Sequence, residues 1–340
     1  MRAIRLDLHR QVSRAALASE LRTTFLERAP SGVLHSVAAA LARGRRLRLE
    51  PGWHFHFPSD DAGQLTLLKR DIWTYYRDSG IARPVVFHWY DRLRVRLYLG
   101  NDLSLCLYVL GAFEPNEFVF LSRLLGPGMV VLDGGANEGV YSLYAARLVG
   151  RQGAVLAVEP STREFRRLRA NIEMNRLDNV KTFKVALGSQ AGEALLAVAA
   201  SNHAGMNAIE RQSSDQPAAA WTESHEAVPV ETIDAIVDRC RLQRLDVVKL
   251  DVEGSEVDAM DGAHAAIARF QPKILLEAEE ARLASQGRTK EDLLRVLTAI
   301  GYELWVFDAD SAQLRRAELP AEPEGNAIAA PRDWRPPILS

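Results

Sequence analysis

Apolar residues in the first 50 positions recur at the spacing of a helix. Leu17, Leu21 and Phe25 show this pattern, which predicts one or two amphipathic helices in an N-terminal segment over residues 1–50. The same segment holds ten arginines against four acidic residues. A basic face of this kind fits a phosphorylated or nucleotide-bearing partner, but a solvated helix face or a self-association arm is the more common explanation. We therefore expect helices here, with a homodimer as one use of them.

The pattern changes to a period of two after this segment. From Arg92 to Leu99 apolar residues alternate with Arg and Tyr, which predicts a half-buried strand. A second alternating run, Leu103–Val109, follows Gly100-Asn101-Asp102, so the pair predicts a β-hairpin. A helix is expected next, over Asn116–Leu125. Residues 51–125 are therefore expected to form a small α+β subdomain.

Short apolar runs alternate with helical patterns after Gly128. The runs, each too short for a helix, predict strands at Met129–Asp133, Ala154–Glu159, Lys181–Leu187, Val247–Val252, Lys273–Glu277 and Glu303–Phe307. Helices are expected at Val140–Val149, after a capping-box spacing at Ser161 and Glu164, and at Thr232–Cys240, Ser255–Phe270 and Thr289–Ile300. Because strands separated by helices need crossover connections, the sheet should be mostly parallel and covered on both faces. The fold class is α/β, a Rossmann-like doubly wound sheet over residues 126–310.

Two segments break this alternation. Residues 188–229 are rich in Ala, Ser and Gln with weak periodicity, which predicts an insertion made of an extra hairpin and a loop. Such an insertion serves as a lid in some enzymes and is only a surface loop in others. Residues 311–340 are expected to form a C-terminal tail.

Composition narrows the class of protein. The 340-residue chain is 47% hydrophobic and 25% charged with a formal net charge of -2, so nothing in the overall charge attracts nucleic acid. Its two cysteines, Cys106 and Cys240, show no metal-ligand or disulfide spacing. The N-terminus has no apolar run of the length that a signal peptide or membrane span needs. We expect a cytoplasmic protein without a membrane span.

A glycine-rich loop follows the first strand of the predicted sheet. The run from Asp133 to Gly139 places an acid at the strand end, then a turn, then a helix start, where such sheets bind nucleotide-type cofactors. Its spacing departs from the GxGxxG of dinucleotide enzymes. A carboxylate at Asp133 opposes a pyrophosphate but suits S-adenosylmethionine, which carries a sulfonium and an ammonium. Glu159, at the end of the second strand, stands where an acid can take both ribose hydroxyls.

The expected cofactor-binding residues combine this loop with the next strand ends. They are Asp133, Gly135, Asn137, Gly139, Glu159, Ala186 and Leu187, the last two as an apolar wall for adenine. A nicotinamide-dependent oxidoreductase is the alternative from another class of enzyme, since the fold and Glu159 suit both. Asp133 and the missing GxGxxG argue against it.

Three motifs resemble the FkbM family of methyltransferases. Asp133-Gly134-Gly135-Ala136-Asn137-Glu138-Gly139 is similar to its D-x-G-A-N-x-G motif, and the run from Lys249 to Glu256 to its K-x-D-V-E-G-x-E motif. Gly111 to Glu117 is similar to its G-x-x-E-P-x-E lead-in. The resemblance covers about Tyr98 to Phe307 and implies a class I methyltransferase fold. It also implies methyl transfer, usually to a hydroxyl of a sugar, glycolipid or polyketide-type natural product.

One departure concerns the candidate catalytic residues. Many relatives carry a histidine close to the glutamate that ends the fifth strand, but the run here is Leu276-Glu277-Ala278-Glu279-Glu280. A base is needed because the acceptor hydroxyl must lose its proton. Asp251, at the end of the fourth strand, is the best candidate for it, with Glu277 on the next strand as a second acid.

The role of these acids has alternatives. Asp251 and Glu277 could instead hold a magnesium ion that lowers the pKa of the acceptor. His203 and His264 are reserve bases, and Glu256 is expected to make a structural contact near the next helix. A catalytically silent S-adenosylmethionine-binding protein is a further interpretation, which the absent histidine keeps open. The acceptor, a small molecule or a glycan, is not identified by the sequence.

Overall fold

The computed structural model describes residues 30–43, 63–210, 221–308, 313–318 and 325–339, and these fall into two compact units. Among the described residues, the first unit comprises residues 30–43, 63–89 and 95–113, and the second comprises residues 90–94 and the described residues from 114 onward. The helical pattern at Leu17, Leu21 and Phe25 lies outside the described residues.

The first unit combines helices with a two-stranded sheet. Its elements are α2 (Ser31–Arg43), α3 (Gln64–Ser79), β1 (Val85–His88), β2 (Arg94–Leu97), α4 (Asp102–Ser104) and the π-helix η2 (Leu105–Leu110). The half-buried strand predicted for this segment is confirmed as β2, in which Val95 and Leu97 are buried and Arg94 and Arg96 are exposed. The strand pairs with β1.

The predicted second strand of the hairpin is wrong, because residues 103–109 are helical. The Asn101 side chain accepts a hydrogen bond from the Ser104 backbone N–H at 2.8 Å, which caps a helix start. Trp73 Nε1 donates to the Ser104 hydroxyl at 2.9 Å and fixes this start to α3. Since Leu107, Tyr108 and Val109 are all buried, the alternation did not mark a half-exposed face. Residues buried on all sides carry no period that separates helix from strand.

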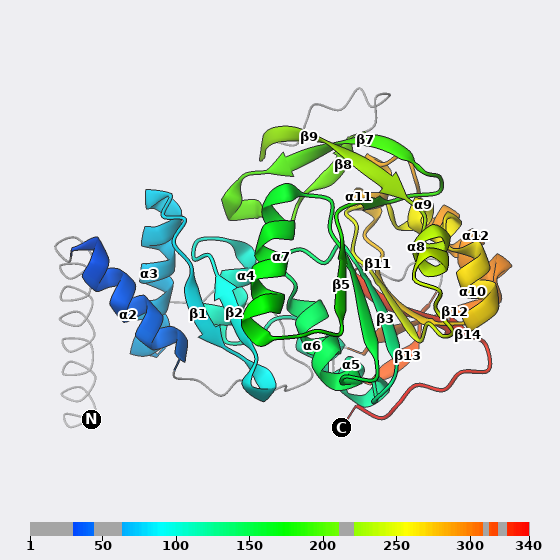
Figure 1. Cartoon of the computed structure of the whole chain (residues 1–340), viewed down its shortest axis with the longest axis horizontal. Coiled ribbons are helices and arrows are strands. Elements are labelled where there is room, and N and C mark those ends of the chain that lie inside the picture. The colour runs from blue at the N-terminus through cyan, green and yellow to red at the C-terminus, as the bar shows by residue number, and fades with distance from the viewer. Residues whose placement is uncertain (1–29, 44–62, 211–220, 309–312, 319–324, 340) are drawn as a thin grey trace, which may run out of the picture. The chain divides into compact units, whose positions relative to one another are not determined.

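The second unit is built on an eight-stranded sheet (Figure 1) with the order β13-β12-β14-β11-β10-β3-β4-β5. The strands are β3 (Val130–Gly134), β4 (Ala154–Val158), β5 (Val180–Phe183), β10 (Val247–Leu250), β11 (Lys273–Glu277), β12 (Tyr302–Phe307), β13 (Leu314–Arg316) and β14 (Asn326–Pro331). The five central strands from β5 to β11 pair in parallel. The predicted mostly parallel α/β sheet is therefore confirmed.

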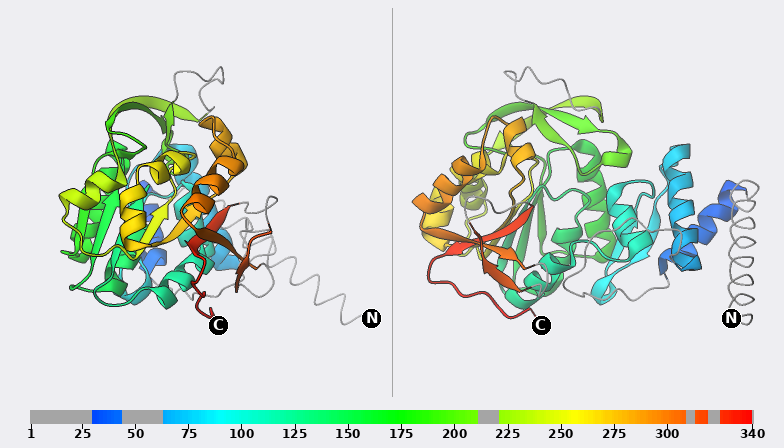
Figure 2. Two further views of the ribbon diagram at one scale, coloured as in Figure 1. Left: turned by 90° about the vertical axis from the view of Figure 1, so that its right-hand side faces the viewer. Right: turned by 180° about the vertical axis from the view of Figure 1, so that it is seen from behind.

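Helices cover both faces of this sheet (Figure 2). They are α5 (Pro115–Leu124), α6 (Val140–Val149), α7 (Thr162–Asn175), α8 (Ile233–Arg239), α9 (Glu256–Asp261), α10 (His264–Phe270), α11 (Glu280–Ser285) and α12 (Lys290–Ala299). The main core packs one strand face, which includes Leu132 and Leu250, against residues of α8, α9, α10 and α12. A smaller cluster packs Ala157, on the other face, against Leu168 of α7. Strand alternation thus sends each side chain to one of two helix layers.

The insertion forms a second, smaller sheet. Its order is β6-β9-β7-β8, with β6 (Ala186–Leu187), β7 (Gly192–Ala199), β8 (Ala208–Glu210) and β9 (Thr222–Glu231). Within residues 188–229, β7 pairs antiparallel with the next strand, β8, and on its other edge with β9. The run predicted as one strand over Lys181–Leu187 is divided, because β5 ends in the large sheet and β6 pairs with β9.

The C-terminal residues are part of the sheet, and the expected tail over residues 311–340 is wrong in this respect. β14 lies between β11 and β12 and is antiparallel to both. Ala327, Ile328, Ala329 and Ala330 are fully buried there. Alanines at alternating positions gave too weak a hydrophobic signal to predict a strand, although small residues suit a strand buried on both faces.

Several expected helix bounds shift by only one residue, but one helix is divided. Ser255–Phe270 forms α9 and α10, with a break at Gly262. Gly262 lies close to the Gly188 carbonyl, and a Cβ there would approach it to 2.1 Å. Within the described residues, no single helix is long and apolar enough to cross a membrane, while one bent pair, α4 with η2 followed by α5, passes that test jointly.

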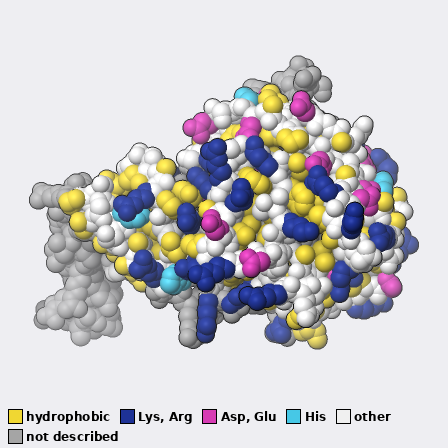
Figure 3. All heavy atoms as spheres, viewed as in Figure 1, with side chains coloured by type: hydrophobic (Ala, Val, Ile, Leu, Met, Phe, Trp, Pro, Cys, Tyr) yellow, Lys and Arg dark blue, Asp and Glu magenta, His cyan; other side chains and the backbone are white. Residues whose placement is uncertain are grey.

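One face of the molecule carries many positively charged side chains. Figure 3 shows Lys and Arg side chains spread over the face that carries α7. Many acids are inside instead: seven acidic side chains but only four basic ones are buried among the described residues. Most of these buried acids belong to the site described next.

Candidate active site

The glycine-rich loop is shaped by close contact with the neighbouring strand end. Gly135 has φ +70°, and a Cβ there would lie 1.8 Å from the Asp251 carbonyl oxygen. Asn137 also has a positive φ, +49°, and Gly139 starts α6 with φ +94°. No side chain fits at Gly135 because the loop passes directly over the end of β10.

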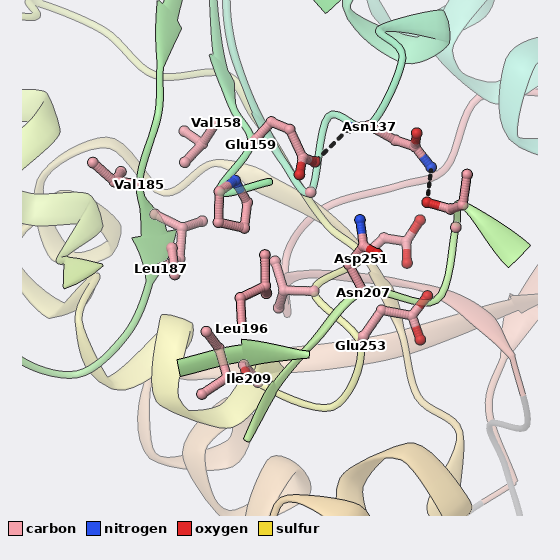
Figure 4. A pocket seen from close by; sticks show the side chains of 17 residues that line it. Asn137, Val158, Glu159, Val185, Leu187, Leu196, Asn207, Ile209, Asp251 and Glu253 are labelled. Atoms are coloured by element: carbon pink, nitrogen blue, oxygen red, sulfur yellow. Dashed lines mark hydrogen bonds between the residues drawn. The ribbon is translucent and has the colours of Figure 1, made fainter. Parts of the chain in front are cut away.

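Glu159 fastens this loop from the end of β4. One carboxylate oxygen accepts the Asn137 backbone N–H at 2.9 Å (Figure 4). The other accepts the Ser161 backbone N–H, also at 2.9 Å. Burial raises the pKa of Glu159 to about 8, with a contribution from Glu164, although both backbone hydrogen bonds oppose the rise. Glu159, which the sequence predicts to bind the ribose, therefore also holds the loop in place.

The capping box expected at Ser161 takes a different form. Ser161 is the N-cap of α7, but its hydroxyl donates to the Glu164 carboxylate and caps no backbone N–H. Glu164 also accepts a hydrogen bond from Asn207 of the insertion at 3.0 Å. The spacing therefore predicted the helix start correctly and the hydrogen bond incorrectly.

Asp133 is buried beneath the loop. It accepts a 2.5 Å hydrogen bond from the Ser142 hydroxyl, and one of its oxygens lies 3.7 Å from Lys249 Nζ. The two residues are register partners on the parallel strands β3 and β10, so their side chains point to the same face. Burial raises the pKa of Asp133, while Lys249 and Ser142 oppose the rise.

Lys249 ties three parts of the site together. Its Nζ lies 3.1 Å from the Asp251 carboxylate and donates to the Gly135 carbonyl at 3.0 Å. Burial alone would lower the pKa of Lys249, but Asp251 and Asp133 together raise it. Lys249 therefore remains an ammonium ion that holds the strand-end acids against the loop.

A pocket of about 580 Å³, part of it open to solvent, lies beside this loop. Its walls combine the loop, the strand ends and the insertion, and they include Gly135, Asn137, Val158, Glu159, Val185, Ala186, Leu187, Leu196, Asn207, Ile209, Asp251, Val252 and Glu253. Figure 4 shows apolar side chains on one side and Asp251 and Glu253 on the other.

The structure brings most of the predicted site residues to this pocket. Gly135, Asn137, Glu159, Ala186 and Leu187 line it and are called here the loop half. Asp251 lines it as well. The other three predicted residues, Asp133, Gly139 and Glu277, are not among the lining residues.

Acids and one arginine surround Asp251, and Asp251, Glu253 and Glu277 are called here the strand-end half. Glu253 has φ +55° and pairs with Arg282 at 2.7 Å. Burial and the nearby Asp251 raise the pKa of Glu277 to about 7. Because no spacing rule links Arg282 of α11 to Glu253, sequence reasoning missed this pair.

Glu256 makes the structural contact expected of it. Its carboxylate accepts the backbone N–H groups of Val252 and Gly254 at 3.0 and 3.3 Å. Burial raises its pKa to about 7. The reserve histidines lie elsewhere: His203 is in the 3-10 turn η3 (Ser201–His203) and His264 is exposed at the start of α10.

The insertion contributes a wall that sequence reasoning did not assign. Asn207 and Ile209 line the pocket, and the Ile209 carbonyl accepts a 2.7 Å hydrogen bond from Gln286. Asn137 of the loop donates to the Ala204 carbonyl at 3.5 Å. The only sequence signal for this wall was the presence of polar side chains in a segment of weak periodicity.

The arrangement defines a class of protein before any comparison. A parallel sheet with a glycine-rich loop after its first central strand, and an acid at the end of the second, binds a nucleoside cofactor at its carboxyl edge. The predicted class I methyltransferase fold is present, and its sheet includes the antiparallel strand β14 between β11 and β12.

Comparison with known proteins identifies the family. Residues 133–304, half of the chain, match the Methyltransferase FkbM domain, and the chain belongs to this family of S-adenosylmethionine-dependent methyltransferases. The resemblance of the sequence motifs is thereby confirmed, and the oxidoreductase alternative is wrong.

Two curated relatives match parts of the chain. It is 30% identical over 214 residues to the AMB antimetabolite synthetase AmbE of Pseudomonas aeruginosa, covering 53% of this chain and 10% of that protein. It is 29% identical over 145 residues to Methyltransferase 1 of Beauveria bassiana, covering 39% of this chain and 57% of that protein. A solved FkbM methyltransferase from Methylobacillus flagellatus is 16% identical with a TM-score of 0.38, covering 78% of this chain and 53% of that one.

Proposed function

We propose that this chain methylates a hydroxyl oxygen of a small molecule or glycan, with Asp251 as the base. The observation that carries the proposal is the position of Asp251 at the pocket wall, 3.1 Å from Lys249 and directly beneath the Gly135 turn. Its side chain is 38% exposed, so an acceptor can reach it.

The loop half provides the donor site in this proposal. Glu159 takes the ribose hydroxyls with lone pairs that its two backbone hydrogen bonds leave over. Ala186 and Leu187 face adenine, with Leu196 and Ile209 of the insertion on the same apolar side. Asn137 and Gly135 line the path to the methionyl group. Asp133 and Gly139 do not line the pocket. Asp133 contributes through its charge, and Gly139 contributes by starting α6.

Methyl transfer is an in-line displacement at the methyl carbon. The bond from sulfur to methyl breaks while a bond from the acceptor oxygen to methyl forms, and the acceptor proton passes to the Asp251 carboxylate. Lys249 holds that carboxylate in one orientation through its ion pair. Glu277, at the end of the adjacent strand β11 and outside the pocket lining, is the second acid of the site.

The acceptor class follows from the resemblance and from one relative. We infer a sugar, glycolipid or polyketide-type natural product, and the name of the first relative, an antimetabolite synthetase, fits natural-product biosynthesis. A cytoplasmic location and a homodimer remain predictions of the sequence.

Transfer of a labelled methyl group tests this function. The protein is incubated with S-adenosylmethionine labelled on its methyl group and a panel of hydroxylated sugars and polyketides. We expect Asp251→Asn to lower turnover at least about 100-fold while donor affinity stays within a few-fold. Asp238→Asn, an exposed change on α8, is the matched control. Unchanged turnover in Asp251→Asn would remove this residue from the role of base.

A silent donor-binding protein is the second candidate, favoured by the absence of a histidine from the run Leu276 to Glu280. Donor binding without transfer to any acceptor in the panel supports it. The same assay therefore separates the two functions.

A further inference from the structure

Glu114 lies behind the pocket wall and belongs to no part of the site described so far. It precedes α5 with φ +43°, a strained conformation for a glutamate, which fixes its carboxylate among groups from three other elements. One oxygen accepts a 2.5 Å hydrogen bond from the Tyr141 hydroxyl of α6. The other accepts a 3.3 Å hydrogen bond from Asn326 at the start of β14.

The link from Glu114 to the pocket runs through Tyr141 and Lys249. The Lys249 ammonium lies 5.0 Å from the centre of the Tyr141 ring, a cation–π contact. The same ammonium binds the Gly135 carbonyl and the Asp251 carboxylate, which are both at the pocket wall. Glu114 is therefore one layer of side chains away from the pocket.

Among the charged side chains around Glu114, the acids outnumber the bases. The titratable groups that face it are Glu117 of α5, Tyr141 of α6, Lys249 of β10, and Asp251 directly after β10. Asp133 of β3 adds a further carboxylate beside Lys249. Lys249 is the cation among these described groups, so the acids outnumber it. When these carboxyls are ionised, their negative charge exceeds the positive charge of Lys249 and favours a ligand that carries positive charge.

We propose that Glu114 is a positioning residue for the methyl donor: from behind Tyr141 and Lys249 its carboxylate strengthens binding of the sulfonium ion relative to the uncharged thioether product. This inference rests on the proposed donor site. Glu114 thereby helps the protein to bind the methyl donor more tightly than the thioether product, in addition to what the pocket-lining residues contribute.

The protonation state of Glu114 makes the effect depend on pH. Burial and the neighbouring Glu117 and Asp251 raise its pKa to about 8, against the opposing effects of Tyr141 and Lys249. The carboxyl is thus mostly neutral at pH 7 and mostly ionised at pH 9. Discrimination due to Glu114 should therefore increase between these values.

The test compares the dissociation constants of S-adenosylmethionine and S-adenosylhomocysteine for the full chain. Both ligands share the adenosine, carboxylate and amino groups, so the ratio of their constants isolates the sulfonium charge. We expect Glu114→Gln to lower the preference for S-adenosylmethionine about fivefold at pH 9 and less than about twofold at pH 7, with S-adenosylhomocysteine affinity unchanged. Comparison at equal pH removes the contribution of Glu159, which titrates in both proteins. Glu291→Gln, exposed on α12, is the charge-matched control.

A second variant tests the same idea without removing the charge. Tyr141→Phe keeps the ring over Lys249 but removes the hydrogen bond that lowers the pKa of Glu114. The midpoint of the pH-dependent preference should move upward. Equal weakening of both ligands by Glu114→Gln, or an unmoved midpoint in Tyr141→Phe, would overturn the inference while leaving the donor site intact. If neither ligand binds the unmodified protein, the proposed donor site fails together with it.

Discussion

The loop half of the pocket is shaped by the backbone, whereas the strand-end half is held by side chains from distant segments. Glu159 binds two backbone N–H groups, and Gly135 leaves space for a carbonyl. Asp251 and Glu253 depend instead on Lys249 and Arg282. Backbone contacts suit a ligand that every member of a family shares, while side chains can change with the acceptor.

The largest effect is expected from filling the space in the loop half. Gly135→Ala places a Cβ 1.8 Å from the Asp251 carbonyl and should reduce donor affinity more than about 100-fold by displacing the loop from β10. Gly80→Ala is the matched control, since Gly80 has a left-handed conformation with a similar φ of +61° and nothing within 4 Å. Calorimetric titration measures both. Equal losses in the two variants would show that backbone strain, and not the contact with Asp251, causes the effect.

A smaller effect should follow from changing the carboxylate that fastens the loop. Glu159→Gln replaces one acceptor oxygen with an amide nitrogen, so one of two backbone N–H groups loses its partner. We expect donor affinity to fall about tenfold. Glu173→Gln, exposed on α7, should leave affinity unchanged. An unaffected Glu159→Gln would contradict the assigned role.

The loop half and the strand-end half also differ in how well they could be predicted from the sequence. The loop half could be predicted because its glycines, Asp133 and Glu159 lie at fixed distances along the chain from two strand ends. Asp251 could be predicted as a strand-end acid, but Glu253 with Arg282 and Glu114 with Asn326 could not. These pairs join residues that only the folded sheet brings together, as in the 212-residue separation between Glu114 and Asn326.

The failures in the fold have related causes. The run Leu103–Val109 alternates by accident inside a buried helix, and β14 is a strand of alanines with little hydrophobic contrast. Most residues of both segments are buried, so the periods of helix and strand do not separate a buried face from an exposed one. The central strands were predicted well because glycines and helices punctuate them.

Stability should fall as pH rises, mainly through acids near the strand-end half. The folded-state pKa values of Glu256 and Glu277 are about 7, and those of Glu114 and Glu159 are about 8. Since these are above the unfolded value, the folded protein holds more protons between pH 4.5 and 8, and stability is lost over this window. The two acids with lowered pKa, Glu226 and Asp292, titrate below it.

Urea unfolding at pH 5.5 and pH 8.0 measures this difference. We expect the free energy of unfolding to be lower at pH 8.0 than at pH 5.5, because these carboxyls keep their protons in the folded chain at the lower pH while the unfolded chain has already lost them. Glu159→Gln should retain most of the drop, because it removes only one of these acids. A free energy that rises with pH would contradict the burial of these carboxyls.

The smallest effect is expected from metal chelation. Groups of three or more His, Cys, Asp or Glu side chains able to hold a metal ion are absent from the described part of the chain. The magnesium ion that the sequence analysis gives as an alternative would have only Asp251 and Glu277 as protein ligands. EDTA should therefore leave methyl transfer within about twofold. Loss of activity, restored by magnesium, would show that the strand-end half binds the ion.

Titration of the full chain with S-adenosylmethionine, and separately with NADH, tests the central claim most directly. We predict micromolar binding of S-adenosylmethionine that Gly135→Ala abolishes and Gly80→Ala preserves, with no heat from NADH. Binding of NADH, or undiminished S-adenosylmethionine binding in Gly135→Ala, would contradict the assignment of this pocket to the methyl donor.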